Sequence, residues 1–392
     1  MMRAVHFGAG KIGRGFLGQL YYQSGYHTTF IDVVPEIVGA LQSRGGYPVY
    51  IACDDPETVA VSDVTAVHGT DLDAVARAIA AADIASTAVG VNVLDRIAGP
   101  IAEGLRLRFA DPEAAPLDFI VCENLIEAGD WLRARVRAAL PPELHGLFDA
   151  RVGFVDASIG RMVPLIDHPD DPLFVAVEPY CDLPIDKSAF RAGIPPIVHL
   201  QPRDNFGAYV ERKLFVHNMS HAATGYLGYL KGHEYTWQAV ADPDVRGAVE
   251  AALAESCEGL HRKHGLPLVE LREHGQDLLR RYGNRALGDQ ILRVAADPVR
   301  KLGPNDRLIG AARMCLEQGV NPAAIAFAAA AALRYDPPGD AGAQSIQSLL
   351  NAQGLSGVLF TVCQLPADSP LTGILHAASE RLDREGWRKQ DH

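Results

Sequence analysis

A glycine-rich turn near the N-terminus constrains the fold of this chain more than any other segment. Gly8-Ala9-Gly10-Lys11-Ile12-Gly13 follows an apolar, strand-like run at 3–8 and precedes an expected helix at about 12–24. A strand, a G-x-G-x-x-G turn and a helix in that order are typical of a dinucleotide-binding unit. There Gly8 permits the tight turn, Gly10 lets the backbone approach a pyrophosphate, and Gly13 lets helix and strand pack closely. The helix N-terminus then offers N–H groups to an anion.

Strand-like and helical segments alternate along the first half of the chain. After the runs at 3–8 and 27–33, apolar strand-like runs recur at 47–53, 59–67, 84–89, 119–122, 152–155 and 173–177. Helical stretches at 72–82, 93–107 and 128–140 lie between several of them. Strands joined by helix-length crossovers predict a mostly parallel sheet with helices on both faces. We therefore expect an α/β unit of the Rossmann type.

The second half of the chain has a different character. Helical patterns at 206–229, 243–264, 306–318 and 323–334 follow one another, and strand-like runs nearly vanish. Pro195, Pro196 and Pro202 lie close to this change. A chain of 392 residues has room for two domains. The predicted domains are 1–197, which binds the nucleotide, and 198–392, which is all-α and carries the substrate and catalytic groups.

Charge and composition exclude several classes of protein. The formal net charge is −12 and no Lys/Arg run is present, so we do not expect nucleic-acid binding. The longest apolar stretch, Ala323–Leu333, is too short to cross a bilayer. The six cysteines are scattered without a C-x-x-C pair and indicate reduced thiols. We expect no signal peptide, because the first residues lead directly into a strand-like run. We therefore expect a soluble, cytoplasmic protein.

An acidic residue after the second strand favours NAD as the dinucleotide. Asp32 ends the run at 27–33, about 20 residues beyond the last glycine, where a carboxylate can bind the ribose hydroxyls. It would repel the 2′-phosphate of NADP, and Val33 and Val34 offer no arginine to receive one. The alternative is a surface aspartate at a strand end. Val89, which ends the run at 84–89, completes the candidate cofactor contacts with Gly8, Ala9, Gly10, Lys11, Ile12, Gly13 and Asp32.

A lysine, a neutral amide and an imidazole share one arc of the helix expected at 206–229. In a regular α-helix, Asn218 lies about 140° and His221 about 80° around the axis from Lys213. Lysine is a general base for alcohol oxidation when partial burial lowers its pKa. An amide can donate to the developing alkoxide, and an imidazole can orient a hydroxyl. Periodicity alone leaves two alternatives open: His217, at about 40°, and an ordinary amphipathic helix with a solvated lysine.

The Lys213-x4-Asn218-x2-His221 spacing, together with the N-terminal segment 6–16, resembles the polyol-specific long-chain dehydrogenases of the mannitol dehydrogenase family. The resemblance extends over nearly the whole chain. Further matching stretches, in the same order, are Thr87-Ala-Val-Gly90, Cys122-Glu-Asn124, Val152-Gly-Phe-Val-Asp156, Asp186-Lys187, Val210-Glu-Arg-Lys-Leu-Phe215, Arg300-Lys-Leu302 and Asp306-Arg-Leu308.

The resemblance implies a metal-independent, NAD-dependent oxidation of a polyol. Lys213 would be the general base, and Asn124 and Asn218 would hold the reacting oxygen. His221, rather than His217, would position the substrate. The branch of the family that the chain resembles most acts on mannitol 1-phosphate, so the favoured reaction interconverts D-mannitol 1-phosphate and D-fructose 6-phosphate. No His/Cys set with zinc spacing competes with this interpretation.

Two positions depart from the family pattern. Gly160-Arg161 stands where the family usually has Asp-Arg, which removes a possible hydrogen-bond acceptor near the substrate. Lys11 stands where the branch tends to have asparagine. A phosphorylated substrate would need a cationic clamp because an unpaired dianion is costly to desolvate. The candidate substrate contacts are Arg161, Arg300 and Arg334.

Two alternative functions remain open from the sequence. The enzyme could act on an unphosphorylated hexitol or on a hexuronate, as the related fructuronate and tagaturonate reductases do. A chain of this fold could also be a nucleotide-sensing binding protein without chemistry. The intact set of Lys213, Asn218 and His221 argues against the second alternative. Oligomeric state and physiological direction have no signal in the sequence.

Overall fold

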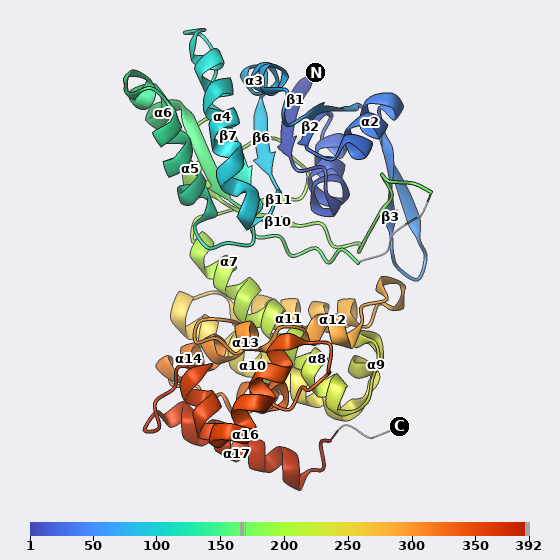
Figure 1. Ribbon diagram of the computed structural model, residues 1–392, viewed down its shortest axis with the longest axis vertical. Coiled ribbons are helices and arrows are strands. Elements are labelled where there is room, and N and C mark those ends of the chain that lie inside the picture. The colour runs from blue at the N-terminus through green and yellow to red at the C-terminus, as the bar shows by residue number, and fades with distance from the viewer. Residues whose placement is uncertain (165–167, 169, 389–392) are drawn as a thin grey trace. The chain divides into compact units, whose positions relative to one another are not determined.

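Six parallel strands form the main sheet of the N-terminal unit, in the order β5-β2-β1-β6-β7-β8 (Figure 1). The computed structural model describes residues 1–164, 168 and 170–388 and divides the chain into two units, Met1–Phe206 and Gly207–His392. The order changes direction between β1 and β6, the point at which open parallel sheets bind ligands. The strands are β1 (Met2–Phe7), β2 (Tyr26–Asp32), β5 (Val64–His68), β6 (Ile84–Thr87), β7 (Leu117–Val121) and β8 (Val152–Asp156).

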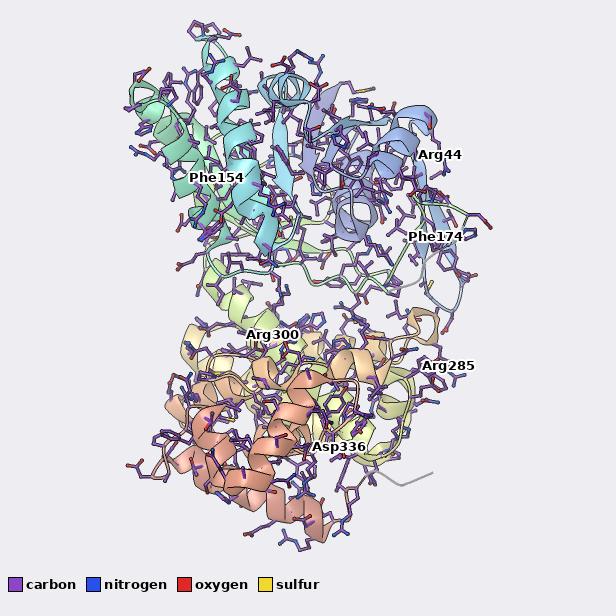
Figure 2. The ribbon with its side chains drawn as sticks, viewed as in Figure 1. Arg44, Phe154, Phe174, Arg285, Arg300 and Asp336 are labelled. Carbon is purple, nitrogen blue, oxygen red and sulfur yellow. The ribbon has the colours of Figure 1, made fainter. Side chains whose placement is uncertain are left out.

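Helices cover both faces of this sheet because the strands are apolar on both sides. Every residue of β6 and β7 is buried, as expected for a parallel sheet between two helical layers. Phe119 and Phe154 stack at 5.1 Å between ring centroids in the core of one face (Phe154 is labelled in Figure 2). That face is covered by α3 (Leu72–Ala80), α4 (Leu94–Phe109), α5 (Ala128–Ala139) and α6 (His145–Arg151), and the other by η1 (Gly13–Gly18) and α1 (Gln19–Gln23).

Two smaller sheets complete the first unit. β3 (Tyr47–Ile51) pairs antiparallel with β4 (Glu57–Val61) and parallel with β9 (Val175–Val177), and α2 (Pro35–Arg44) lies nearby in the fold. Arg44, which is labelled in Figure 2, ends α2 and forms an ion pair of 2.6 Å with Asp171. β10 (Leu183–Asp186) and β11 (Leu200–Arg203) form a parallel pair. The short helices are η2 (Val91–Val93), η3 (Pro142–Leu144) and η4 (Lys187–Ala189).

One strand prediction is wrong. The run at 59–67 is not a single strand but the end of β4 and most of β5, which belong to different sheets. Asp63 adopts a left-handed φ of 56° between them, so the chain turns there. Aspartate tolerates this conformation better than most residues, because its short polar side chain can hydrogen-bond locally.

The described part of the second unit contains helices and no strand. Gly225 and Gly228 let neighbouring helices pack closely against α8, since a Cβ at these positions would lie 3.0 Å from Val294 and 2.8 Å from Ala239. The alanine-rich α15 is almost wholly buried. The helices are α7 (Phe206–Arg212), η5 (Lys213–Asn218), α8 (Met219–Leu230), α9 (Thr236–Ala241), α10 (Pro243–His264), α11 (Leu268–Tyr282), η6 (Arg285–Leu287), α12 (Ile291–Ala295), α13 (Pro298–Lys301), α14 (Ile309–Glu317), α15 (Ala323–Ala332), α16 (Ala341–Thr361) and α17 (Pro370–Arg384).

The predicted fold class, an α/β Rossmann-type unit followed by an all-α unit, is confirmed. The sequence did not predict the helices α2, α6, α9, α11, α12, α13, α16 and α17 or the strands β10 and β11. The structure divides the chain after Phe206, whereas the predicted boundary follows residue 197. Among the described residues, no helix combines the length and the apolar character that crossing a membrane requires.

The buried guanidinium of Arg108 on α4 provides a test of this core. It donates to the carbonyl oxygens of Ala80 (2.9 Å), Ala82 (2.7 Å) and Ala115 (2.8 Å). Ala80 ends α3, whereas Ala82 and Ala115 lie two residues before β6 and β7. Arg108→Met should lower the free energy of unfolding by about 2–4 kcal/mol, because the carbonyls lose their donors. Urea denaturation measures this loss.

Arg106→Met is the matched control on the same helix. Arg106 is 54% exposed and pairs only with Glu103 in the contacts that the structure gives, so its loss should leave the free energy of unfolding nearly unchanged. Equal losses in the two variants would contradict the structural role of Arg108.

Candidate active site

The glycine turn directly follows β1, and neighbouring segments of the first unit hold it in place. Gly8 has a φ of 98°, a left-handed conformation that favours glycine, and a Cβ there would lie 2.4 Å from the carbonyl oxygen of Ala88. Its N–H donates to Ile31 at 2.8 Å, which continues the pairing of β1 with β2. Arg14, which is buried, donates through its guanidinium to the carbonyl of Ala9. The turn therefore has one defined conformation.

The other two glycines differ in their surroundings. A Cβ on Gly13 would lie 2.0 Å from the carbonyl oxygen of Gly8 and 2.8 Å from His6 on β1, so only glycine lets the helix begin this close to the strand. A Cβ on Gly10 would meet no atom within 4 Å. Open space beside Gly10, at the first turn of a helix, leaves room for an anion against helix N–H groups.

Asp32 connects the end of β2 to the glycine turn. Its Oδ2 accepts the N–H of Ala9 at 2.6 Å and its Oδ1 accepts the N–H of Val34 at 3.0 Å. A carboxylate has about four acceptor sites, so these two bonds leave others for ribose hydroxyls. The structure therefore gives Asp32 a positioning contact with the turn that the sequence did not predict.

Glu123 holds the turn that follows β6. Its two carboxylate oxygens accept the consecutive N–H groups of Val89 and Gly90, each at 2.8 Å, and its side chain is buried. Gly90 has a φ of 87°, so this turn also needs glycine. Asn124, the predicted second amide of the site, comes next along the chain, after the carboxyl end of β7. Glu123, adjacent to the predicted residue, was missed.

In the second unit, Lys213 and Asn218 mark the first and last residues of a π turn, η5. The prediction of an uninterrupted α-helix over 206–229 is wrong here. In a π turn the hydrogen bonds join residues five apart, so Asn218 comes one such turn after Lys213 and on the same side of the helix. Both side chains are half-buried. A second π turn, η1, lies in the helix after the glycine turn; such turns are rare and are frequent at functional sites.

His221 lies on α8, shortly after this turn. Its Nε2 is 2.9 Å from Oδ2 of Asp289, and its ring stacks on Tyr282 with 4.9 Å between centroids and 16° between planes. Burial lowers the pKa of His221, although the carboxylate of Asp289 acts to raise it. His221 is therefore neutral at neutral pH and fixed in orientation.

His217, the alternative to His221, is more deeply buried. Burial, together with the positive charge of Arg281 and neighbouring groups, lowers its pKa well below the usual value. The backbone carbonyl of His217 accepts the hydroxyl of Tyr282 at 2.9 Å. His217 belongs to the packing behind Tyr282, whereas the side chain of His221 remains 17% exposed.

The three arginines predicted as substrate contacts make contacts with protein groups. Arg161 is buried and donates to Glu178 (2.9 Å), Gly15 (2.9 Å) and Gln19 (2.8 Å), so it ties the segment around 161 to the first helix. Arg300, 51% exposed and labelled in Figure 2, pairs with Asp297 at 2.8 Å. Arg334 pairs with Asp383 at 3.0 Å. Their substrate role stays a prediction.

The space at Gly160 and the lack of a metal-binding cluster in the described part of the chain bear on which ligands the site can hold. At Gly160, where the family usually has aspartate, a Cβ would lie 3.3 Å from the ring of Tyr180, so a larger residue would need this ring to give way. Among the described residues, no group of three or more His, Cys, Asp or Glu side chains could hold a metal ion.

Comparison with known proteins follows the same division of the chain. Residues 2–199 match the mannitol dehydrogenase Rossmann domain, and residues 205–355 match the mannitol dehydrogenase C-terminal domain. The chain is 39% identical to a mannitol-1-phosphate 5-dehydrogenase of Brevibacillus brevis over 97% of this chain and 98% of the relative. It is 40% identical to the enzyme of that name from Geobacillus thermodenitrificans, over 98% and 100%.

Two solved structures have the same fold. One is a ternary complex of Pseudomonas fluorescens mannitol 2-dehydrogenase with NAD and D-mannitol, with a TM-score of 0.71, 19% identity, and coverage of 98% of this chain and 92% of that one. The other is a substrate-free D-sorbitol dehydrogenase, with a TM-score of 0.82, 17% identity, and coverage of 98% and 93%.

The glycine turn on a Rossmann-type sheet, followed by a helical unit that carries Lys213, defines a two-domain dehydrogenase fold. Both domain matches and the relatives above then identify its branch: the chain belongs to the mannitol dehydrogenase family. The predicted family and the predicted class of enzyme, a polyol dehydrogenase, are confirmed.

The contacts of Glu123 lead to a prediction for the turn after β6. Glu123→Ala removes the acceptors of two buried N–H groups, so the free energy of unfolding should fall by about 1–3 kcal/mol. If Val89 contacts the cofactor as predicted, the Kd for NADH should also rise about 10-fold, which corresponds to about 1.4 kcal/mol. Fluorescence titration with NADH measures the Kd.

Glu123→Gln serves as the control because it keeps the shape of the side chain and one acceptor oxygen. Its effects should be smaller than those of the alanine variant. Unchanged stability and NADH affinity in Glu123→Ala would show that the carboxylate does not hold the turn.

Proposed function

We propose that this protein is an NAD-dependent dehydrogenase that interconverts D-mannitol 1-phosphate and D-fructose 6-phosphate. The observation that carries the proposal is a sequence identity of about 39% with relatives named mannitol-1-phosphate 5-dehydrogenase, over nearly their full length. The chain keeps Lys213, Asn218 and His221 within one π turn and the first turn of α8, which supports chemistry rather than binding alone.

The first unit suits a dinucleotide with an unmodified ribose. Open space beside Gly10 fits a pyrophosphate at the helix N-terminus, and Asp32 retains acceptor sites for ribose hydroxyls. Val33 and Val34 offer no cation to a 2′-phosphate, which favours NAD over NADP. NAD, when bound, supplies the acceptor for the hydride that leaves the carbinol carbon.

The second unit supplies the groups that handle the hydroxyl proton. Lys213 takes this proton at Nζ as the C–H bond breaks, so a CH–OH group becomes C=O with loss of one hydride and one proton. The amide of Asn218, on the same side of the helix, donates to the oxygen as negative charge develops on it. Asn124 is the proposed second amide donor, and His221 orients the substrate.

The other substrates considered from the sequence receive less support. The two relatives compared above at 39% and 40% identity are named for the phosphorylated polyol. A nucleotide-sensing protein without chemistry would not need a lysine, an amide and an imidazole together. We include a cytoplasmic location in the proposal, supported by six cysteines that form no disulfide bond in the described part of the chain.

The reaction itself is tested with the purified chain, NADH and a pair of ketoses. NADH oxidation, followed by its absorbance, should be rapid with fructose 6-phosphate and at least about 100-fold less efficient in kcat/KM with fructose, because charge-assisted bonds to a phosphate contribute several kcal/mol. Preference for fructose would indicate a hexitol dehydrogenase. No turnover with either ketose, or with hexuronates, would favour a binding protein.

Removal of the general base is the sharpest test of the mechanism. Lys213→Ala should lower kcat by about 10²- to 10⁴-fold, the usual contribution of general acid–base catalysis, while NADH binding survives. Lys263→Ala is the control, since Lys263 pairs with Glu211 at 2.7 Å and has no proposed role in the reaction. Near-normal turnover of Lys213→Ala at neutral pH would exclude the mechanism.

A further inference from the structure

Asp289 is a buried carboxylate to which no function has been assigned above. It precedes α12 and its side chain is only 6% exposed. Oδ2 lies 2.9 Å from Nε2 of His221, and Oδ1 accepts Nε of Arg293 at 2.9 Å and a second, short bond from Nη2 of the same guanidinium. One carboxylate therefore fixes two side chains of the helical unit, one through each oxygen.

The protonation states in this group follow from burial and charge. Burial acts to raise the pKa of Asp289, but its hydrogen bond with His221 and the charge of Arg293 hold the pKa below the usual value. Burial lowers the pKa of His221. At neutral pH the pair is thus a carboxylate and a neutral imidazole.

The tautomer of His221 follows from these states. A carboxylate only accepts hydrogen bonds, so the single ring proton of neutral His221 must lie on Nε2, where it is donated to Asp289. Nδ1 then carries a lone pair and can only accept. The stacking of the ring on Tyr282, whose own hydroxyl is anchored on the carbonyl of His217 at 2.9 Å, fixes the plane in which Nδ1 lies.

We propose that Asp289 is a positioning residue that keeps the proton of His221 on Nε2, so that Nδ1 accepts a hydrogen bond from a hydroxyl group of the substrate. This inference rests on the proposed function, in which His221 orients the substrate. A polyol presents several hydroxyl donors, and a neutral imidazole with a defined acceptor nitrogen selects the orientation in which one of them points to Nδ1.

Asp289→Asn inverts the tautomer with little change in shape. The guanidinium of Arg293 can only donate, so it takes the amide oxygen of the new side chain. The amide NH₂ then faces Nε2 of His221, which must become the acceptor, and the ring proton moves to Nδ1. A protonated Nδ1 can no longer accept the hydroxyl proton of the substrate, so this hydroxyl must turn and accept instead, which changes the orientation of the substrate.

Two measurements follow this change. ¹⁵N NMR of the histidine-labelled protein with bound NADH should show protonated Nε2 of His221 in the wild type and protonated Nδ1 in Asp289→Asn; the resonance is assigned by its loss in His221→Asn. kcat for oxidation of mannitol 1-phosphate should fall about 10- to 100-fold, as when a group that orients a functional imidazole is lost. The Kd for NADH should not change.

Asp242→Asn is the matched control. Nε2 of His233 lies 3.0 Å from Oδ2 of Asp242, close to the 2.9 Å of the Asp289–His221 pair. Asp242 is the N-cap of α10 and has no proposed role in the reaction. Asparagine is as good as aspartate at an N-cap, so the fold should tolerate the change. kcat of Asp242→Asn should equal that of the wild type.

The double variant Asp289→Asn/Arg293→Met distinguishes the effect of the changed tautomer of His221 from the effect of a general disturbance of the fold. Without Arg293 the amide can turn its oxygen to His221, so NMR should show the proton back on Nε2. If Asp289→Asn alone does not fold, the inference is tested in the double variant and in Arg293→Met, both of which should keep the wild-type tautomer.

A wild-type His221 protonated on Nδ1, or an Asp289→Asn variant that folds and keeps normal kcat, would overturn the inference. The proposed function fails differently: the wild-type protein then turns over neither mannitol 1-phosphate nor fructose 6-phosphate, whatever the tautomer of His221.

Discussion

The pairing of β1 with β2 on one side and β6 on the other is the interaction on which the nucleotide-binding unit depends. Parallel pairing brings the carboxyl ends of neighbouring strands to one edge of the sheet. Phe7 lies beside both Ile31 and Thr87 in the register, so the turns that follow the three strands begin side by side. The hydrogen bond from Ala9 to Asp32 joins two of these turns directly. A shift of register by one residue would separate these groups and turn the apolar faces of the strands the wrong way.

Two carboxylates at this edge of the sheet bind backbone N–H groups of the protein itself. Asp32 and Glu123 each accept two backbone N–H groups, and each fixes a turn that includes or adjoins a glycine with positive φ. Backbone in such conformations persists only where the surroundings hold it, because the unfolded chain has many other conformations available. The loops proposed to contact the cofactor are thus held by the protein's own hydrogen bonds, and such preorganisation lowers the entropic cost of binding.

In the helical unit, too, the protein's own groups fix the residues proposed to act on the substrate. The π turn brings Lys213 and Asn218 to one side of the helix, and Asp289 with Tyr282 fixes the ring of His221. Buried polar groups of this kind are costly when unpaired and rigid when all partners are present. The proposed base, the proposed amide donor and the oriented imidazole therefore lie on two successive helical turns, which is compatible with the proposed removal of a proton from an alcohol.

Local patterns in the sequence were sufficient for the parts of the protein that depend on local physics. The order of strand, glycine turn and helix, the alternation up to Val177 and the helical periodicity after Phe206 identified the fold class, because burial on a given face imposes these periods on any chain. The spacing of Lys213, Asn218 and His221, read with the resemblance, identified the family.

Tertiary structure alone decided which groups support these residues. Asp289 is distant in sequence from His221, and nothing in the residues around either one indicates that they pair; only the packing of α8 against α12 and the turn before it brings them together. The π turn likewise has no signature in a helical wheel; in the folded chain, η5 packs against α10, α11 and α14. The run 59–67 divides between two sheets because β4 pairs with β3 whereas β5 pairs with β2. The sequence by itself determined which segments form helices, strands and turns, because periodicity and turn chemistry act over a few residues. Tertiary packing determined which polar groups contact one another, because only the folded chain sets the distances between them.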